Sequence, residues 1–157
     1  GVLLAGALIV VGIGAVIFGR LSDRWGRERT LDLGIAGVMT ALIVLAGLLA
    51  LNVSPLKAVA LASPLVFLAS AIAPSVLAIV GDRALLTMRG TAMGLYSVVL
   101  GVGMAVGAII GSLAAVGGGL LGIVVAALVV FSVATALYVI LKAVTARFSR
   151  RYNGDRQ

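Results

Sequence analysis

Long apolar runs alternate with short polar connections along this chain of 157 residues. Each run is close to or longer than the roughly 20 residues that an α-helix needs to cross a bilayer. The runs are continuously apolar and do not alternate with polar residues, which argues against β-barrel strands. The pattern therefore predicts an all-α integral membrane protein. Its five spans are expected at about residues 1–19, 31–51, 58–80, 91–116 and 120–141.

The basic residues mark one end of this predicted bundle. Of the 12 Lys and Arg residues, all but Lys57 lie in the first connection, the third connection or the tail 142–157. Because Lys and Arg gather in cytoplasmic loops, these three segments are predicted to be cytoplasmic and Gly1 to lie at the outer face. We therefore expect a multi-pass protein of the plasma membrane, with the lipid bilayer as one partner.

Composition agrees with a single membrane domain over residues 1–157 and argues against other classes. The chain is 62% hydrophobic and only 11% charged, whereas soluble domains are about a quarter charged. Its net charge of +7 is explained by basic residues that flank the spans, and no nucleic-acid motif is present. It has no Cys and no His, which removes zinc sites and imidazole-dependent triads. We expect no enzyme activity, no catalytic residue, no metal and no cofactor.

The start of the chain suggests part of a longer protein. Gly1 lies inside an apolar run, without the basic start of a signal peptide. Five spans would also place the two termini on opposite sides of the membrane, which is unusual for a unit built from pairs or triplets of helices. We therefore expect a further helix before Gly1.

Glycine recurs at helical spacing in the predicted span 91–116. Gly103, Gly107 and Gly111 are four residues apart and so share one helix face. Small residues at this spacing let helix backbones approach closely in a membrane. This face is predicted to pack against another helix, either as a fixed contact or as an interface that slides or rocks.

The predicted span 58–80 is weakly polar and contains helix-breaking residues. They are Ser63, Ser70, Ser75, Pro64 and Pro74. Proline removes a helix hydrogen bond and tends to kink the segment. The three serines are candidate cavity-lining residues along a solute path, although packing alone accounts for them equally well.

A dense run of charge, GRLSDRWGRERTL, separates the first two predicted spans. It resembles the signature loop of the major facilitator superfamily. The matching residues are Gly19, Leu21, Ser22, Asp23, Arg24, Gly26, Arg27 and Leu31. Glu28 departs from the pattern, because a basic residue is usual there. The stretch from Arg89 to Ser112 also resembles an inner loop and glycine-rich helix of this family, although Ala108 replaces the proline of its antiporter motif.

This resemblance implies twelve helices in two halves, with a small solute carried between the halves by alternating access. In this family, the fourth helix of the amino-terminal half often carries an arginine, which the span 58–80 lacks. A basic tail, without a further span, follows the last span. Both features favour helices eight to twelve of the carboxy-terminal half. The implied partners are the missing half of the transporter and an unidentified small-molecule substrate. The alternative is a non-transporting membrane subunit or scaffold that packs through its glycine-rich faces.

The signature loop is predicted to act as a conformational latch. Asp23 is expected to pair with Arg24 or Arg27, or to face the positive N-terminus of another helix. Gly19 and Gly26 permit a tight turn and close approach. Such a cluster is expected to hold one end of the bundle closed in one state and to open in the other. The alternative is that the loop only anchors the topology.

Overall fold

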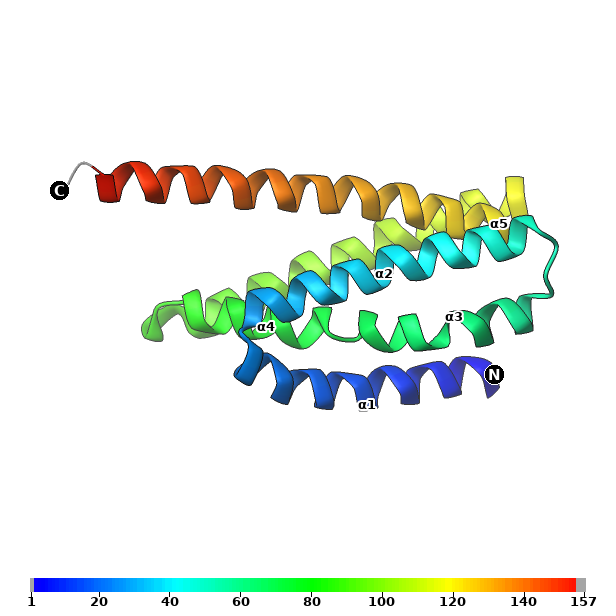
Figure 1. Ribbon diagram of the computed structural model, residues 1–157, viewed down its shortest axis with the longest axis horizontal. Coiled ribbons are helices and arrows are strands. Elements are labelled where there is room, and N and C mark those ends of the chain that lie inside the picture. Colours follow the sequence, from blue (N-terminus) through cyan, green and yellow to red (C-terminus); the bar gives the residue numbers. More distant parts are fainter. Residues whose placement is uncertain (1, 155–157) are drawn as a thin grey trace.

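The computed structural model describes residues 2–154, and these residues form long helices that run roughly along one axis (Figure 1). The elements are α1 (Val2–Trp25), α2 (Arg27–Ala50), α3 (Pro55–Ala69), α4 (Ile72–Arg83), the 3₁₀ turn η1 (Leu86–Met88) and α5 (Arg89–Gly154). No strand occurs between residues 2 and 154. The all-α class predicted from the apolar runs is confirmed.

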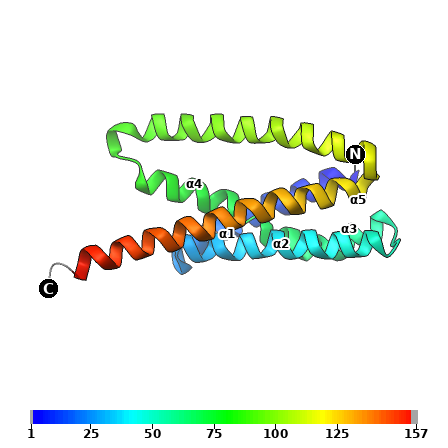
Figure 2. The ribbon, with the colours of Figure 1, turned by 90° about the horizontal axis from the view of Figure 1, so that it is seen from above.

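Three helical stretches in the described part of the chain are long and apolar enough to cross a membrane. They are Arg27–Ala50, Pro55–Arg83 and Arg89–Thr145. The last stretch is far longer than the roughly 20 residues that one crossing requires. It reverses at Gly119, whose φ of 55° and ψ of −140° are not helical, so α5 consists of two limbs that run in opposite directions (Figure 2). We call residues 89–118 the first limb and residues 120–154 the second limb.

The charged stretch that was expected to be a connection is almost entirely helical. α1 continues to Trp25 and α2 begins at Arg27, so Gly26 alone separates them. Arginine and glutamate are good helix formers, which lets both helices extend through the charged residues. Gly26 makes the reversal between the helices with a φ of 93°, a region that other residues rarely enter.

The segment of α3 and α4 is interrupted at Ser70 and Ala71, and Pro64 lies within α3 without breaking it. Pro74 has no N–H, so the carbonyl of Ser70 loses its normal helical partner. The N–H groups of Ser70 and Ala71 instead bond to carbonyls three residues earlier, at 3.2 and 3.1 Å. The interruption expected from the prolines is present, one turn before Pro74.

This break is buried, and glycines on the neighbouring helices make room for it. A Cβ atom on Gly37 of α2 would lie 2.7 Å from the Cβ of Leu68, and one on Gly34 would lie 2.8 Å from Ile72 Cγ1. A Cβ atom on Gly14 of α1 would come still closer to Oγ of Ser70. A side chain at any of these glycines would force its neighbours to shift, so the α3–α4 break packs closely between two glycine-bearing helices.

Candidate functional site

Arg27, the first residue of α2, lies at the centre of a charged cluster at one end of the helices. Its Nη1 donates a hydrogen bond of 2.7 Å to the carbonyl of Ala78 and also pairs with the carboxylate of Asp82, both on α4. Its Nη2 lies 3.9 Å from Oδ1 of Asp23 at the end of α1. A guanidinium can serve several acceptors at once because it has five N–H donors in one plane. One side chain therefore joins α1, α2 and α4.

The two carboxylates around Arg27 differ in their contact with it. Asp82 makes the close pair, whereas Asp23 is at the limit of an ion pair and its side chain is 70% exposed. The signature-loop pattern indicated Asp23 as a partner of Arg27 and gave no indication of Asp82. The available signal was the position of Asp82 at the end of an apolar span, on the same side as the excess of arginine. The partner itself depends on how α2 and α4 pack.

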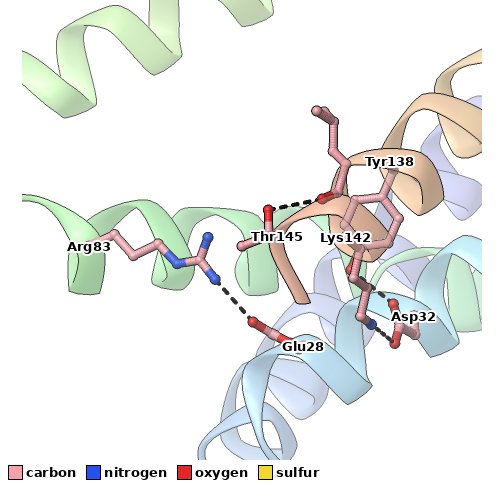
Figure 3. Close-up of polar contacts among 7 residues, drawn as sticks. Glu28, Asp32, Arg83, Tyr138, Lys142 and Thr145 are labelled. Atoms are coloured by element: carbon pink, nitrogen blue, oxygen red, sulfur yellow. Dashed lines mark hydrogen bonds and ion pairs between the residues drawn. The ribbon is translucent and has the colours of Figure 1, made fainter. Parts of the chain in front are cut away.

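Glu28, the residue that departs from the family pattern, also has a partner on α4. Its Oε1 accepts a hydrogen bond of 3.0 Å from Nη2 of Arg83, as Figure 3 shows. A basic residue at position 28 would bring like charge to Arg83. The acidic residue at position 28 is therefore explained by its ion pair with Arg83 of α4.

A third contact joins α2 to the second limb of α5. Asp32 accepts a 2.9 Å hydrogen bond from the Tyr138 hydroxyl at Oδ1, and a 2.6 Å bond from Lys142 Nζ at Oδ2 (Figure 3). The ammonium of Lys142 also lies 5.6 Å from the centre of the Tyr138 ring, within reach of a cation–π interaction. No sequence pattern indicated this three-residue contact, because Asp32 is more than 100 positions from both Tyr138 and Lys142.

The remaining residues of the predicted latch surround this cluster. A cavity of about 400 Å³ lies beside Arg27, between α1, α2 and α4, and Asp23 and Gly26 contribute to its lining. Arg24 is exposed, and the described residues show no ion pair for it. A Cβ atom added to Gly19 would lie 4.0 Å from the Cβ of Pro74 on α4, which is an ordinary contact distance.

The three serines of the α3–α4 segment lie in different surroundings. Ser63 is exposed and donates to the carbonyl of Ala60 at 2.7 Å, whereas Ser70 is buried and donates to Phe67 at 2.6 Å. Ser75 is fully buried and its hydroxyl has no hydrogen-bond partner among the described residues. A cavity-lining role for these serines stays a prediction.

The glycine face of the first limb is open in the described chain. A Cβ atom added to Gly103, Gly107 or Gly111 would meet nothing within 4 Å. Close contacts for an added Cβ occur instead at Gly14, Gly34 and Gly37, and at Gly122 against the Ala114 carbonyl, and none of these glycines belongs to the predicted face. The predicted packing role of the first three glycines stays a prediction that requires a partner beyond these residues.

The chemistry available in this cluster is reversible ion pairing between helices. In the part of the chain that the structure describes, no group of three or more His, Cys, Asp or Glu residues is placed to hold a metal ion. Long apolar helices with ion pairs gathered at one end define a polytopic membrane protein.

The chain matches the Major Facilitator Superfamily over residues 1–156 and belongs to that family. The resemblance seen in the signature loop is thereby confirmed, and with it a transporter-type function in general. Comparisons with curated proteins and with solved structures give no match.

Proposed function

We propose that this chain is part of a secondary active transporter that moves a small solute across the plasma membrane by alternating access. Family membership supports transport rather than enzymatic chemistry. The observation that carries the mechanism is that one side chain of α2, Arg27, contacts both α1 and α4 at the charged end of the bundle.

We further propose that the chain crosses the membrane five times, as helices eight to twelve of the carboxy-terminal half. In this arrangement α1 and α2 cross once each, α3 and α4 cross together, and the two limbs of α5 cross once each. The reversal at Gly119 supports the division of α5. The proposed orientation has the charged end in the cytoplasm, because Lys57 is the one basic residue at the opposite end among residues 2–154.

The latch follows from what must happen to these ion pairs when the charged end opens. Tilting α1 or α4 away from α2 separates Arg27 from Asp23 or from Asp82. Exposed ion pairs are worth up to about 1 kcal/mol each, so losing one changes a two-state equilibrium by less than about tenfold. The cluster is therefore strong enough to bias the two states and weak enough to open during each cycle.

The test is substitution of Asp23 by Asn in the full-length protein reconstituted into liposomes. Asn keeps the shape of the side chain but removes the charge that faces Arg27. Uptake of radiolabelled sugars, amino acids and organic anions is measured for the unmodified protein, and the transported solute is then used for the variant. We expect a several-fold lower uptake rate at an unchanged amount of inserted protein.

The matched control is Arg20→Gln, which removes a charge from the same stretch at an exposed position. This control should transport like the unmodified protein. Normal uptake by Asp23→Asn would contradict the latch. Failure of the unmodified protein to transport any solute of the panel would instead favour a non-transporting membrane subunit.

A further inference from the structure

We propose that a groove between α2, α4 and the second limb of α5 binds the headgroup of an anionic phospholipid. The groove is a cavity of about 450 Å³, within the range of about 300–1,000 Å³ typical of small-molecule sites. Its apolar lining comes from Leu31, Ile79 and Leu141, and its polar lining includes Arg83, Tyr138 and Lys142. This inference does not depend on the proposed transport cycle.

The ends of the apolar stretches put the groove at the level expected for lipid headgroups in the proposed membrane arrangement. Arg83 ends the apolar stretch of α3 and α4, and Lys142 lies near the end of the apolar part of α5. Glu28, in the first turn of α2, lies at the same end. A site at this level presents apolar side chains toward the acyl chains and charged side chains toward the phosphate.

The two cations of the groove are held in place and still have free donors. Arg83 uses one Nη2 bond to Glu28, and Lys142 uses one bond to Asp32. A guanidinium has five N–H donors and an ammonium three, so most of them remain available to phosphate oxygens. The Arg83 side chain is 73% exposed and that of Lys142 is 43% exposed, so a headgroup can reach both.

Figure 3 shows how the carboxylates fix these cations on different walls of the groove. Arg83 extends from α4 toward Glu28, while Lys142 and Tyr138 reach Asp32 from α5. A phosphodiester between the walls would receive charge-assisted hydrogen bonds from both sides. The carboxylates thus orient the cations before binding, which lowers the cost of ordering them.

Charge favours an anionic lipid over a zwitterionic one. The four paired charges of the groove cancel, but the chain has a net charge of +7, and the basic residues that the structure describes gather at this end, except for Lys57. That field attracts a lipid with net negative charge and repels the quaternary ammonium of phosphatidylcholine. The expected occupant is therefore a lipid such as phosphatidylglycerol, with one uncompensated phosphate.

The test measures how lipids change thermal unfolding of the protein in an uncharged detergent, followed by the fluorescence of Trp25, the single tryptophan of this chain. Dioleoyl phosphatidylglycerol should raise the unfolding midpoint in a concentration-dependent way, because it binds the folded state. Dioleoyl phosphatidylcholine, with the same acyl chains, should give a smaller rise, and inorganic phosphate should give none. An equal effect of phosphatidylcholine would overturn the proposal, as would an equal effect of free phosphate.

Substitutions then locate the site. Arg83→Gln and Lys142→Gln should each require about tenfold more phosphatidylglycerol for the same rise, which corresponds to the loss of one charge-assisted hydrogen bond. Lys57→Gln removes one positive charge at the far end of the bundle and should respond like the unmodified protein. Unchanged responses of both groove variants would place the lipid elsewhere and overturn the proposal.

A double variant separates lipid binding from loss of the ion pair. Arg83→Gln leaves Glu28 unpaired, whereas Glu28→Gln together with Arg83→Gln removes both charges and leaves the local charge balanced. We expect the double variant to keep the weakened lipid response of Arg83→Gln. A normal lipid response in the double variant would show that the arginine is not a lipid ligand.

Discussion

Arg27 is the residue on which most of the charged cluster depends. It forms ion pairs with Asp82 and Asp23 and donates a hydrogen bond to the Ala78 carbonyl, and its side chain is 31% exposed. Replacing it by Gln removes charge-assisted bonds at a partly exposed position. We expect the free energy of unfolding in detergent to fall by about 1–2 kcal/mol, as measured by denaturant titration.

Arg20→Gln is the control for this substitution. Arg20 lies in the same charged stretch but on α1, is exposed, and has no ion pair among the described residues. Its replacement should change the free energy of unfolding by less than about 0.5 kcal/mol. A loss equal to that of Arg27→Gln would mean that the net charge of this end, rather than the contacts of Arg27, sets the stability.

For single residues, the sequence predicts only contacts between neighbours along the chain. Asp23 and Arg27 are four residues apart, and their pairing was foreseen as one of several options. Asp82 is 55 positions from Arg27, and Lys142 is 110 positions from Asp32, so neither pair follows from spacing. Such pairs are set by the relative rotation and height of helices, which the apolar pattern leaves open.

The packing of α2 against the α3–α4 break depends on a position without a side chain. A methyl group on Gly37 would lie within 2.7 Å of Leu68 Cβ and 3.2 Å of the backbone nitrogen of Ala69, and neither atom can move without shifting the helix. We expect Gly37→Ala to lower the free energy of unfolding by about 1–3 kcal/mol, as measured by denaturant titration in detergent.

Gly47 lies on the same helix and gives the opposite prediction. A Cβ atom there would meet nothing within 4 Å. Gly47→Ala should leave stability unchanged or raise it by up to about 1 kcal/mol, because alanine lowers the entropy of the unfolded chain. The two substitutions should therefore change the free energy of unfolding in opposite directions. An equal loss of stability in both would contradict the role given to Gly37.

Among the elements, the existence of long apolar helices was predictable and their limits were not. Length and apolarity identify a span, but helix ends in water depend on residues such as Gly26, whose φ of 93° stops α1 from merging with α2. Proline pointed to an interruption without choosing between Pro64 and Pro74. Glycine spacing identified the face of Gly103, whereas the close contacts of α2 with the α3–α4 break belong to Gly34 and Gly37, which are only three residues apart.

In the whole molecule, the first limb of α5 stands apart from most of the other helices, as Figure 2 shows. Many of its large apolar side chains are exposed, including Leu95, Val98 and Val102. Lipid can cover such side chains. The face of Gly103, Gly107 and Gly111 has no side chains for lipid to contact, and such faces typically pack closely against another helix. In the proposed transporter, this face would meet the half that lies outside the chain.

The arrangement of the two halves can therefore be tested with Gly107→Leu in the full-length protein. The side chain would be accommodated within this chain, since a Cβ atom on Gly107 meets nothing within 4 Å, so the amount of inserted protein should not change. Against a close-packed second half it would force the helices apart, and we expect uptake to fall about tenfold, a shift of about 1.4 kcal/mol between the access states. Gly101→Leu places the same side chain about 120° around the helix from Gly107, where it is equally free of contacts, and should transport normally. Equal uptake by the two variants would mean that the face of Gly107 meets lipid, and that the halves associate through other helices.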